Sequence, residues 1–139
     1  MSILRRRAKS KRQGAAPRRF SPRVRSLLQN ARMLKIRAGT EAHRFIGIWF
    51  VLVGERVFVR PYYDKASGWY RASLREPRGA IEVSGRKIAV RTQRARGERL
   101  WNAVDRAYAE KYTTAASRKW VRGFARARRR KTTTELLPR

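Results

Sequence analysis

The sequence contains no cysteine and a single histidine, His43. The first absence excludes disulfides, thiolate metal sites and cysteine nucleophiles. A zinc site normally needs three or four clustered ligands, so one histidine predicts no metal centre. The nine carboxylates are scattered, mostly beside arginines, and neither a glycine-rich phosphate loop nor a nucleophile elbow is present. No residue is therefore nominated as a catalytic acid, base or nucleophile.

Long apolar runs are also missing. No stretch approaches the roughly 20 residues that cross a bilayer. The opening residues, MSILRRRAKSKRQG, are basic but have no apolar stretch behind them, unlike a secretory signal. We therefore expect a cytoplasmic protein. Its 139 residues suit one small domain with one core.

Positive charge is abundant and unevenly distributed. The chain has 37 Lys+Arg against 9 Asp+Glu, a formal net charge of +28. Residues 1–40 hold 13 basic residues and no acidic one, and residues 117–131 hold 8 and none. The intervening residues 41–116 hold 15 basic and 8 acidic residues. Such basic flanks repel themselves and attract polyanions.

Apolar spacing divides the chain into an arm and a domain. Residues 1–20 have almost nothing to bury and are predicted to be a disordered basic arm. The domain, residues 21–139, should begin with a helix over 21–37, since Ser21 suits the N-cap and Pro22 the first helical position. It should end with a basic amphipathic helix over 117–131 and a final edge strand within 132–139.

Short strands separated by tight turns occupy the middle of the domain. They are predicted at 45–53, 56–62, 80–84 and 87–92, with turns at Gly54-Glu55 and Gly85-Arg86. An extended or short helical stretch starts at Trp69, and a helix over 98–112 packs on the sheet. This pattern is typical of a small barrel or sandwich rather than a βαβ sheet.

The segment DKASGWYRASLREPRGAIEV, residues 64–83, carries the main candidate site. Lys65 can hold a phosphate by charge-assisted hydrogen bonds, and the faces of Trp69 and Tyr70 can cover a ring system. Further donors would come from Thr40, Arg44 and Arg60 if the fold brings them close. The alternative is that the two aromatics belong to the core and the arginines are solvated.

The same segment resembles the deazaflavin-dependent nitroreductase family. Lys65, the Trp69-Tyr70 pair and Pro77 match a stretch of that family, although Glu76 stands where the family has asparagine. The order of elements is also similar, from Gly39-Thr40 through two hairpins to a helix with an Arg-Leu-Trp start and paired tyrosines. The chain is still more similar to a neighbouring bacterial family of unknown function, with its patterns IWFVLV–VFVR, SGWYR, AYAEKY and LLPR.

This resemblance covers roughly residues 36–139 and implies a fold. The fold is α+β, a small antiparallel split β-barrel with flanking helices, like that of flavin-mononucleotide-binding proteins. It also implies a redox-type protein that binds flavin mononucleotide or a deazaflavin coenzyme at a dimer interface. As an enzyme, such a protein would be an oxidoreductase whose coenzyme carries the hydride. The implied contacts are Lys65 and Arg44 for phosphate, and Trp69 and Tyr70 for the ring.

An alternative hypothesis remains open, in which the barrel carries basic segments onto nucleic acid or a ribonucleoprotein surface. Each phosphate that a basic side chain neutralises releases a counterion, so such binding needs no base-reading element. The sequence has no ribonucleoprotein motif or zinc finger, so phosphate contacts alone are predicted. The residues expected to make them are Arg5, Arg6, Arg7, Lys9, Lys11, Arg12, Arg126, Arg128, Arg129, Arg130 and Lys131.

Overall fold

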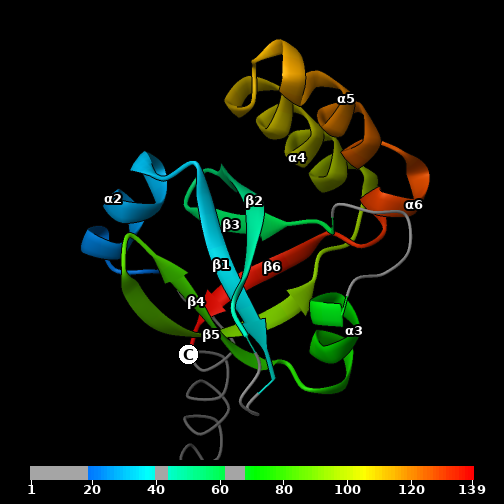
Figure 1. The fold of residues 1–139 in the computed structure, drawn as a ribbon. Coiled ribbons are helices and arrows are strands. Elements are labelled where there is room, and N and C mark those ends of the chain that lie inside the picture. The colour runs from blue at the N-terminus through cyan, green and yellow to red at the C-terminus, as the bar shows by residue number, and fades with distance from the viewer. Residues whose placement is uncertain (1–18, 40–43, 62–67) are drawn as a thin grey trace, which may run out of the picture.

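A computed structural model describes residues 19–39, 44–61 and 68–139, and its centre is a closed antiparallel barrel of six strands (Figure 1). The strands follow one another around the barrel in the order β1-β2-β3-β6-β5-β4, and β4 pairs with β1 to close it. The prediction of a small antiparallel barrel in an α+β domain is confirmed. The strands are β1 (Met33–Ala38), β2 (Ile46–Val53), β3 (Arg56–Val59), β4 (Arg78–Val83), β5 (Arg86–Arg94) and β6 (Thr134–Pro138).

Five helices flank the barrel within the described residues. Helix α3 lies near one end of the barrel, whereas α4, α5 and α6 form a layer beyond β2 and β6 (Figure 1). None of the helices in the described part of the chain is long and apolar enough to cross a membrane. The helices are α2 (Pro22–Asn30), α3 (Gly68–Arg75), α4 (Glu98–Lys111), α5 (Ala115–Phe124) and α6 (Ala127–Arg130).

The first helix is shorter than the sequence predicts. Ser21 caps it as expected, its hydroxyl accepting a hydrogen bond from the Val24 N–H at 3.3 Å. The predicted span of 21–37 is wrong beyond Asn30, because Met33–Ala38 forms strand β1. Leu34 continues the helical spacing of the preceding apolar residues, and this hid the alternating burial that marks the strand.

The chain end closes the barrel instead of lying at its edge. Strand β6 pairs with β3 on one side and with β5 on the other. The expectation of an edge strand was wrong because a barrel has no edge for it to occupy. The β4–β5 turn is also one residue earlier than predicted, at Ser84-Gly85, where φ is 51° and 78°.

The predicted basic helix over 117–131 is two helices. Helix α5 starts at Ala115, where the Thr114 hydroxyl accepts a hydrogen bond from the Ser117 N–H at 3.2 Å. It ends at Phe124, and α6 begins only at Ala127 after a break in which Arg126 is extended. Arg128, Arg129 and Arg130 therefore lie on α6 and not on a continuation of α5. Helix α4, predicted over 98–112, ends one residue earlier than expected.

Two hydrophobic clusters stabilise the domain. One fills the barrel and extends to α2 and α3, and the other lies between the outer faces of β2 and β3 and the helices α4 and α5. Phe20 belongs to the first cluster and is 3% exposed. The domain therefore begins before residue 21, and the rest of the predicted arm, residues 1–18, lies outside the described residues.

Candidate functional site

Helix α3 positions the aromatic pair that the sequence singled out. Trp69, Tyr70 and Ser73 are its buried residues, and the Ser73 hydroxyl donates to the Tyr70 carbonyl at 2.7 Å. The indole and phenol rings meet edge to face, with their centroids 5.9 Å apart. This contact fixes the orientation of the Trp69 ring.

A pocket of about 310 Å³ lies between α3 and the neighbouring ends of β1 and β2. Trp69 forms part of its wall, whereas Tyr70 contacts the Trp69 ring and does not line the pocket. Most of the lining is apolar, with two arginines at the rim. The lining residues are Ile36, Ala38, Arg44, Ile46, Gly68, Trp69, Ala72 and Arg75.

The charge at this pocket is positive. Arg44 and Arg75 are exposed, and neither has an ion-pair partner among the described residues. No carboxylate lines the pocket within the described part of the chain. Two guanidinium groups beside an indole match a ligand that combines a ring with an anionic group.

The carboxylate nearest in sequence does not cancel this charge. Glu76 accepts hydrogen bonds from the Arg78 side chain at 2.8 and 3.1 Å. These bonds from Arg78, together with one from its backbone N–H, lower the pKa of Glu76 to about 2. The charge of Glu76 is thus paired with that of Arg78.

Two of the predicted coenzyme contacts, Thr40 and Lys65, lie outside the described residues. Along the chain they stand four residues before Arg44 and three before Gly68, two residues that line the pocket. The structure brings Trp69 and Arg44 to one pocket. Tyr70 contacts the Trp69 ring and does not line that pocket. Arg60 does not line it either.

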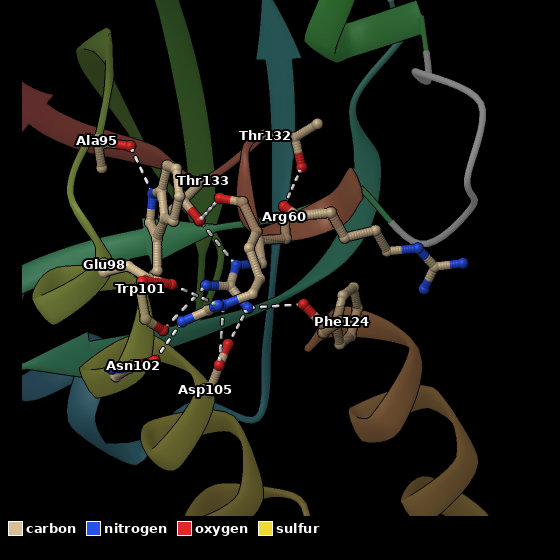
Figure 2. A network of polar contacts seen from close by, with 11 residues as sticks. Arg60, Ala95, Glu98, Trp101, Asn102, Asp105, Phe124, Thr132 and Thr133 are labelled. Carbon is tan, nitrogen blue, oxygen red and sulfur yellow. Dashed lines mark hydrogen bonds and ion pairs between the residues drawn. The ribbon is translucent and has the colours of Figure 1, made fainter. Parts of the chain in front are cut away.

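Arg60 lies in a polar network beneath α4, α5 and α6 (Figure 2). Its guanidinium donates to Asp105 at 2.6 Å and to the Phe124 carbonyl at 2.7 Å. Further bonds run to the Thr133 hydroxyl at 2.8 Å and the Trp101 carbonyl at 3.2 Å. Arg60 is 0% exposed, so its donors are used inside the fold and do not reach the pocket.

The Asp105 carboxylate joins two arginines. One oxygen accepts from Arg60, and the other lies 3.1 Å from Nε of Arg130. Burial lowers the pKa of Arg60, and the hydrogen bond to Asp105 raises it again in part. Arg130 also contacts Glu98 and Asn102, so it ties α6 to the first turn of α4. The network holds the helical layer against the barrel.

The residues predicted for nucleic acid fall into three groups. Those of the arm, from Arg5 to Arg12, lie outside the described residues. Arg126, Arg128 and Lys131 are exposed, as a phosphate contact requires. Arg130 is engaged with Asp105, and Arg129 is 8% exposed and lies over the Phe124 ring, 5.6 Å from its centroid. Part of the basic run over 126–131 therefore packs or forms ion pairs within the domain and is not exposed for binding.

Three features escaped the sequence analysis. One face of helix α3 presents Gly68, Ala72 and Arg75 to the pocket. The helical spacing of these residues is the signal in the sequence that points to Arg75. Asp105 pairs with Arg60, 45 positions before it, and with Arg130, 25 positions after it. No local sequence pattern predicts contacts between such distant residues. Lys111 donates to the Phe50 carbonyl at 3.0 Å, and burial together with Arg32 lowers the pKa of Lys111 to about 8.

Comparison with known proteins agrees with the fold and gives no activity. A model of a family described as uncharacterised proteins conserved in bacteria, DUF2255, matches residues 27–136. The structure is similar to the crystal structure of the conserved hypothetical protein Rv2991 from Mycobacterium tuberculosis, with a TM-score of 0.55 and 12% sequence identity. That match covers 87% of this chain and 81% of the other. No curated protein matches the sequence significantly.

Proposed function

The chain belongs to the DUF2255 family of bacterial proteins, and for this member we propose binding of an anionic, ring-bearing coenzyme in the pocket beneath α3. The coenzyme is flavin mononucleotide or a deazaflavin. A redox role follows, in which the coenzyme supplies the hydride or electron chemistry and the protein binds and orients it. The observation that carries the proposal is the combination, in one pocket, of the Trp69 ring and two arginines without described partners.

The pocket has the composition that coenzyme sites share. Its volume of about 310 Å³ lies at the lower end of the usual range for ligand pockets, roughly 300–1,000 Å³. Ile36, Ile46 and Ala72 provide apolar walls that can exclude water from a planar ring. This volume suits the ring system, with the phosphate-bearing tail directed towards the rim.

Each side chain has a distinct part in this proposal. Trp69 covers one face of the ring, and Tyr70 holds the indole in place. Arg44 and Arg75 bind the anionic tail through charge-assisted hydrogen bonds. Lys65 and Thr40 remain predicted contacts on the segments that flank the pocket in the sequence. A homodimer that completes the site from a second copy also remains a prediction, which sedimentation of the protein with and without coenzyme would test.

Calorimetric titration with flavin mononucleotide and with a deazaflavin coenzyme tests the proposal. We expect one of them to bind below millimolar concentration. The double variant Arg44→Gln/Arg75→Gln should weaken this binding at least about tenfold, since hydrogen bonds to charged groups contribute about 1.5–3 kcal/mol each. The matched control is Arg23→Gln/Arg86→Gln, which removes the same charge at exposed positions on α2 and β5. Absence of binding for both coenzymes, or equal losses in the two doubles, would reject the proposal.

A further inference from the structure

A second hollow, of about 530 Å³, lies on the outer surface of the barrel and is separate from the pocket beneath α3. It runs over β6 between β3 and β5 and reaches the first turn of α4. We call it the arginine groove. Its lining residues are Arg56, Gln93, Arg94, Ala95, Arg96, Leu100 and Glu135.

One arginine of the groove is neutralised within the protein. Arg56 donates to both carboxylate oxygens of Glu135, at 2.8 and 3.0 Å. Glu135 is the only carboxylate among the described lining residues and is 4% exposed. These two hydrogen bonds raise the pKa of Arg56, and the charge of Arg56 balances that of Glu135. The positive charge that remains comes from Arg94 and Arg96.

Those two arginines face solvent and are differently supported. Arg94 donates to the Lys131 carbonyl at 2.9 Å, which holds its guanidinium in place and brings the exposed Lys131 beside the groove. Arg96 has no hydrogen-bond or ion-pair partner among the described residues. A guanidinium has five N–H donors, so both side chains keep donors for an anion.

We propose that the arginine groove binds the phosphodiester backbone of nucleic acid. Adjacent guanidinium groups repel one another, and a chain of phosphates between them relieves that repulsion and releases counterions. No aromatic ring lines the groove among the described residues, so base stacking does not contribute there. The contact is therefore with the backbone and is blind to base sequence.

The basic residues of the groove come together through folding and not through their position in one basic run of the sequence. Two of the basic residues near the chain end, Arg129 and Arg130, are packed or ion-paired inside the domain. Arg94 and Arg96, more than thirty residues earlier, take their place beside Lys131. The exposed Arg126 and Arg128 can extend the path of the backbone beyond the groove.

Three double variants of the full chain, each losing two positive charges, separate the groove from general attraction. Arg94→Gln/Arg96→Gln alters the groove. Arg86→Gln/Lys87→Gln alters the opposite end of the same strand, β5. The end-to-end separation is about 27 Å at roughly 3.4 Å per residue. Arg5→Gln/Arg6→Gln alters the basic arm. Fluorescence anisotropy measures the affinity for a labelled duplex DNA and a labelled single-stranded RNA at 50 and 200 mM salt.

The groove variant should lose the most affinity and become less sensitive to salt. Two lost contacts to duplex DNA reduce the salt slope by about 1.8, so its affinity should fall about tenfold less than that of the wild type between the two salt concentrations. Equal losses in the three doubles, or a larger loss in the arm double, would overturn the proposal. So would a groove double that binds as the wild type does.

Competition identifies the source of the phosphate chain. Unlabelled nucleic acid of scrambled sequence should displace the labelled strand as well as the original sequence does. Inorganic polyphosphate is the other probe, at the same total charge. If it displaces the strand at far lower concentration than nucleic acid does, the groove is a site for free polyphosphate and the nucleic-acid proposal is wrong. The Arg44→Gln/Arg75→Gln double should bind nucleic acid within about twofold of the wild type, since those arginines line the other pocket.

Discussion

Arginine has opposite roles in two regions of this molecule. Beneath α4, α5 and α6, Arg60 is 0% exposed and its guanidinium is bonded to a carboxylate, a hydroxyl and two carbonyls (Figure 2). At the pocket beneath α3, Arg44 and Arg75 are exposed and have no ion-pair partner among the described residues. The first arrangement uses the guanidinium donors inside the fold, and the second leaves them available, as the proposed coenzyme site requires.

The difference shows why the number of basic residues alone is a poor guide to function. Removing a buried arginine whose partners are all internal destabilises the fold, because its partners lose a buried donor. An exposed arginine contributes little to stability, and its donors are exchanged with water or with a bound anion. Burial and internal partners, more than charge, distinguish the two roles.

The largest effect on stability is expected from removing the buried arginine, Arg60. Arg60→Ala should destabilise the protein by about 3–5 kcal/mol, since it breaks a buried ion pair with Asp105, which keeps only its contact with Arg130, and removes the Arg60 donors to two carbonyls. Urea unfolding followed by circular dichroism measures this change. The control Arg75→Ala, an exposed arginine at the pocket, should alter stability by no more than about 0.5 kcal/mol. Similar losses in the two variants would show that the two roles are not distinct.

A smaller loss of stability is expected from removing the Tyr112 hydroxyl, which lies in the cluster between the barrel and helices α4 and α5. The Tyr112 hydroxyl accepts from the Phe50 N–H at 3.0 Å and lies 2.7 Å from the Arg32 carbonyl. The Tyr112 ring stacks on Trp49 with centroids 4.1 Å apart, and phenylalanine keeps this contact. Tyr112→Phe should therefore cost about 1–3 kcal/mol, the cost of leaving a buried donor unpaired. A neutral result in urea unfolding would mean that water replaces the hydroxyl.

The smallest effect concerns pH. The pKa of Lys111 is lowered to about 8 in the folded protein. In the unfolded chain Lys111 keeps its ordinary pKa near 10.5. Between these two values the unfolded state binds more protons, so stability should rise with pH. Lys111→Met should remove this rise, while Lys119→Met, at an exposed position on α5, should keep it. Parallel stability curves for wild type and Lys111→Met from pH 7 to 10.5 would contradict the assignment.

The barrel could be predicted because its signals are local. Alternating burial and glycine turns mark the hairpins, and the strand over 45–53 differs from β2 by only one residue. The strand β1 could not be separated from the helix before it, because Leu34 fits both periodicities. Closure of the barrel by β6 depends on pairing with β3 across more than seventy residues, and no local pattern specifies such a pairing.

The two aromatics belong to the core, the alternative that the sequence left open, and Trp69 also lines the candidate pocket. Trp69 and Arg44 were expected to meet, and they line the same pocket. Arg60 was expected beside them, but β3 delivers it to the helical flank, where Asp105 is available to pair with it. Sequence shows where arginines occur along a strand, but only the packed neighbours decide whether an arginine becomes internal.

Quenching of Trp69 fluorescence is a direct test of coenzyme binding, because this ring forms a wall of the proposed pocket. Flavin mononucleotide and a deazaflavin coenzyme would each be titrated into the wild type and into Trp69→Phe, which keeps an aromatic ring in the core. We expect saturable quenching of the wild-type emission by one coenzyme and loss of most of that quenching in Trp69→Phe. Quenching that is absent from the wild type, or equal in both proteins, would contradict it.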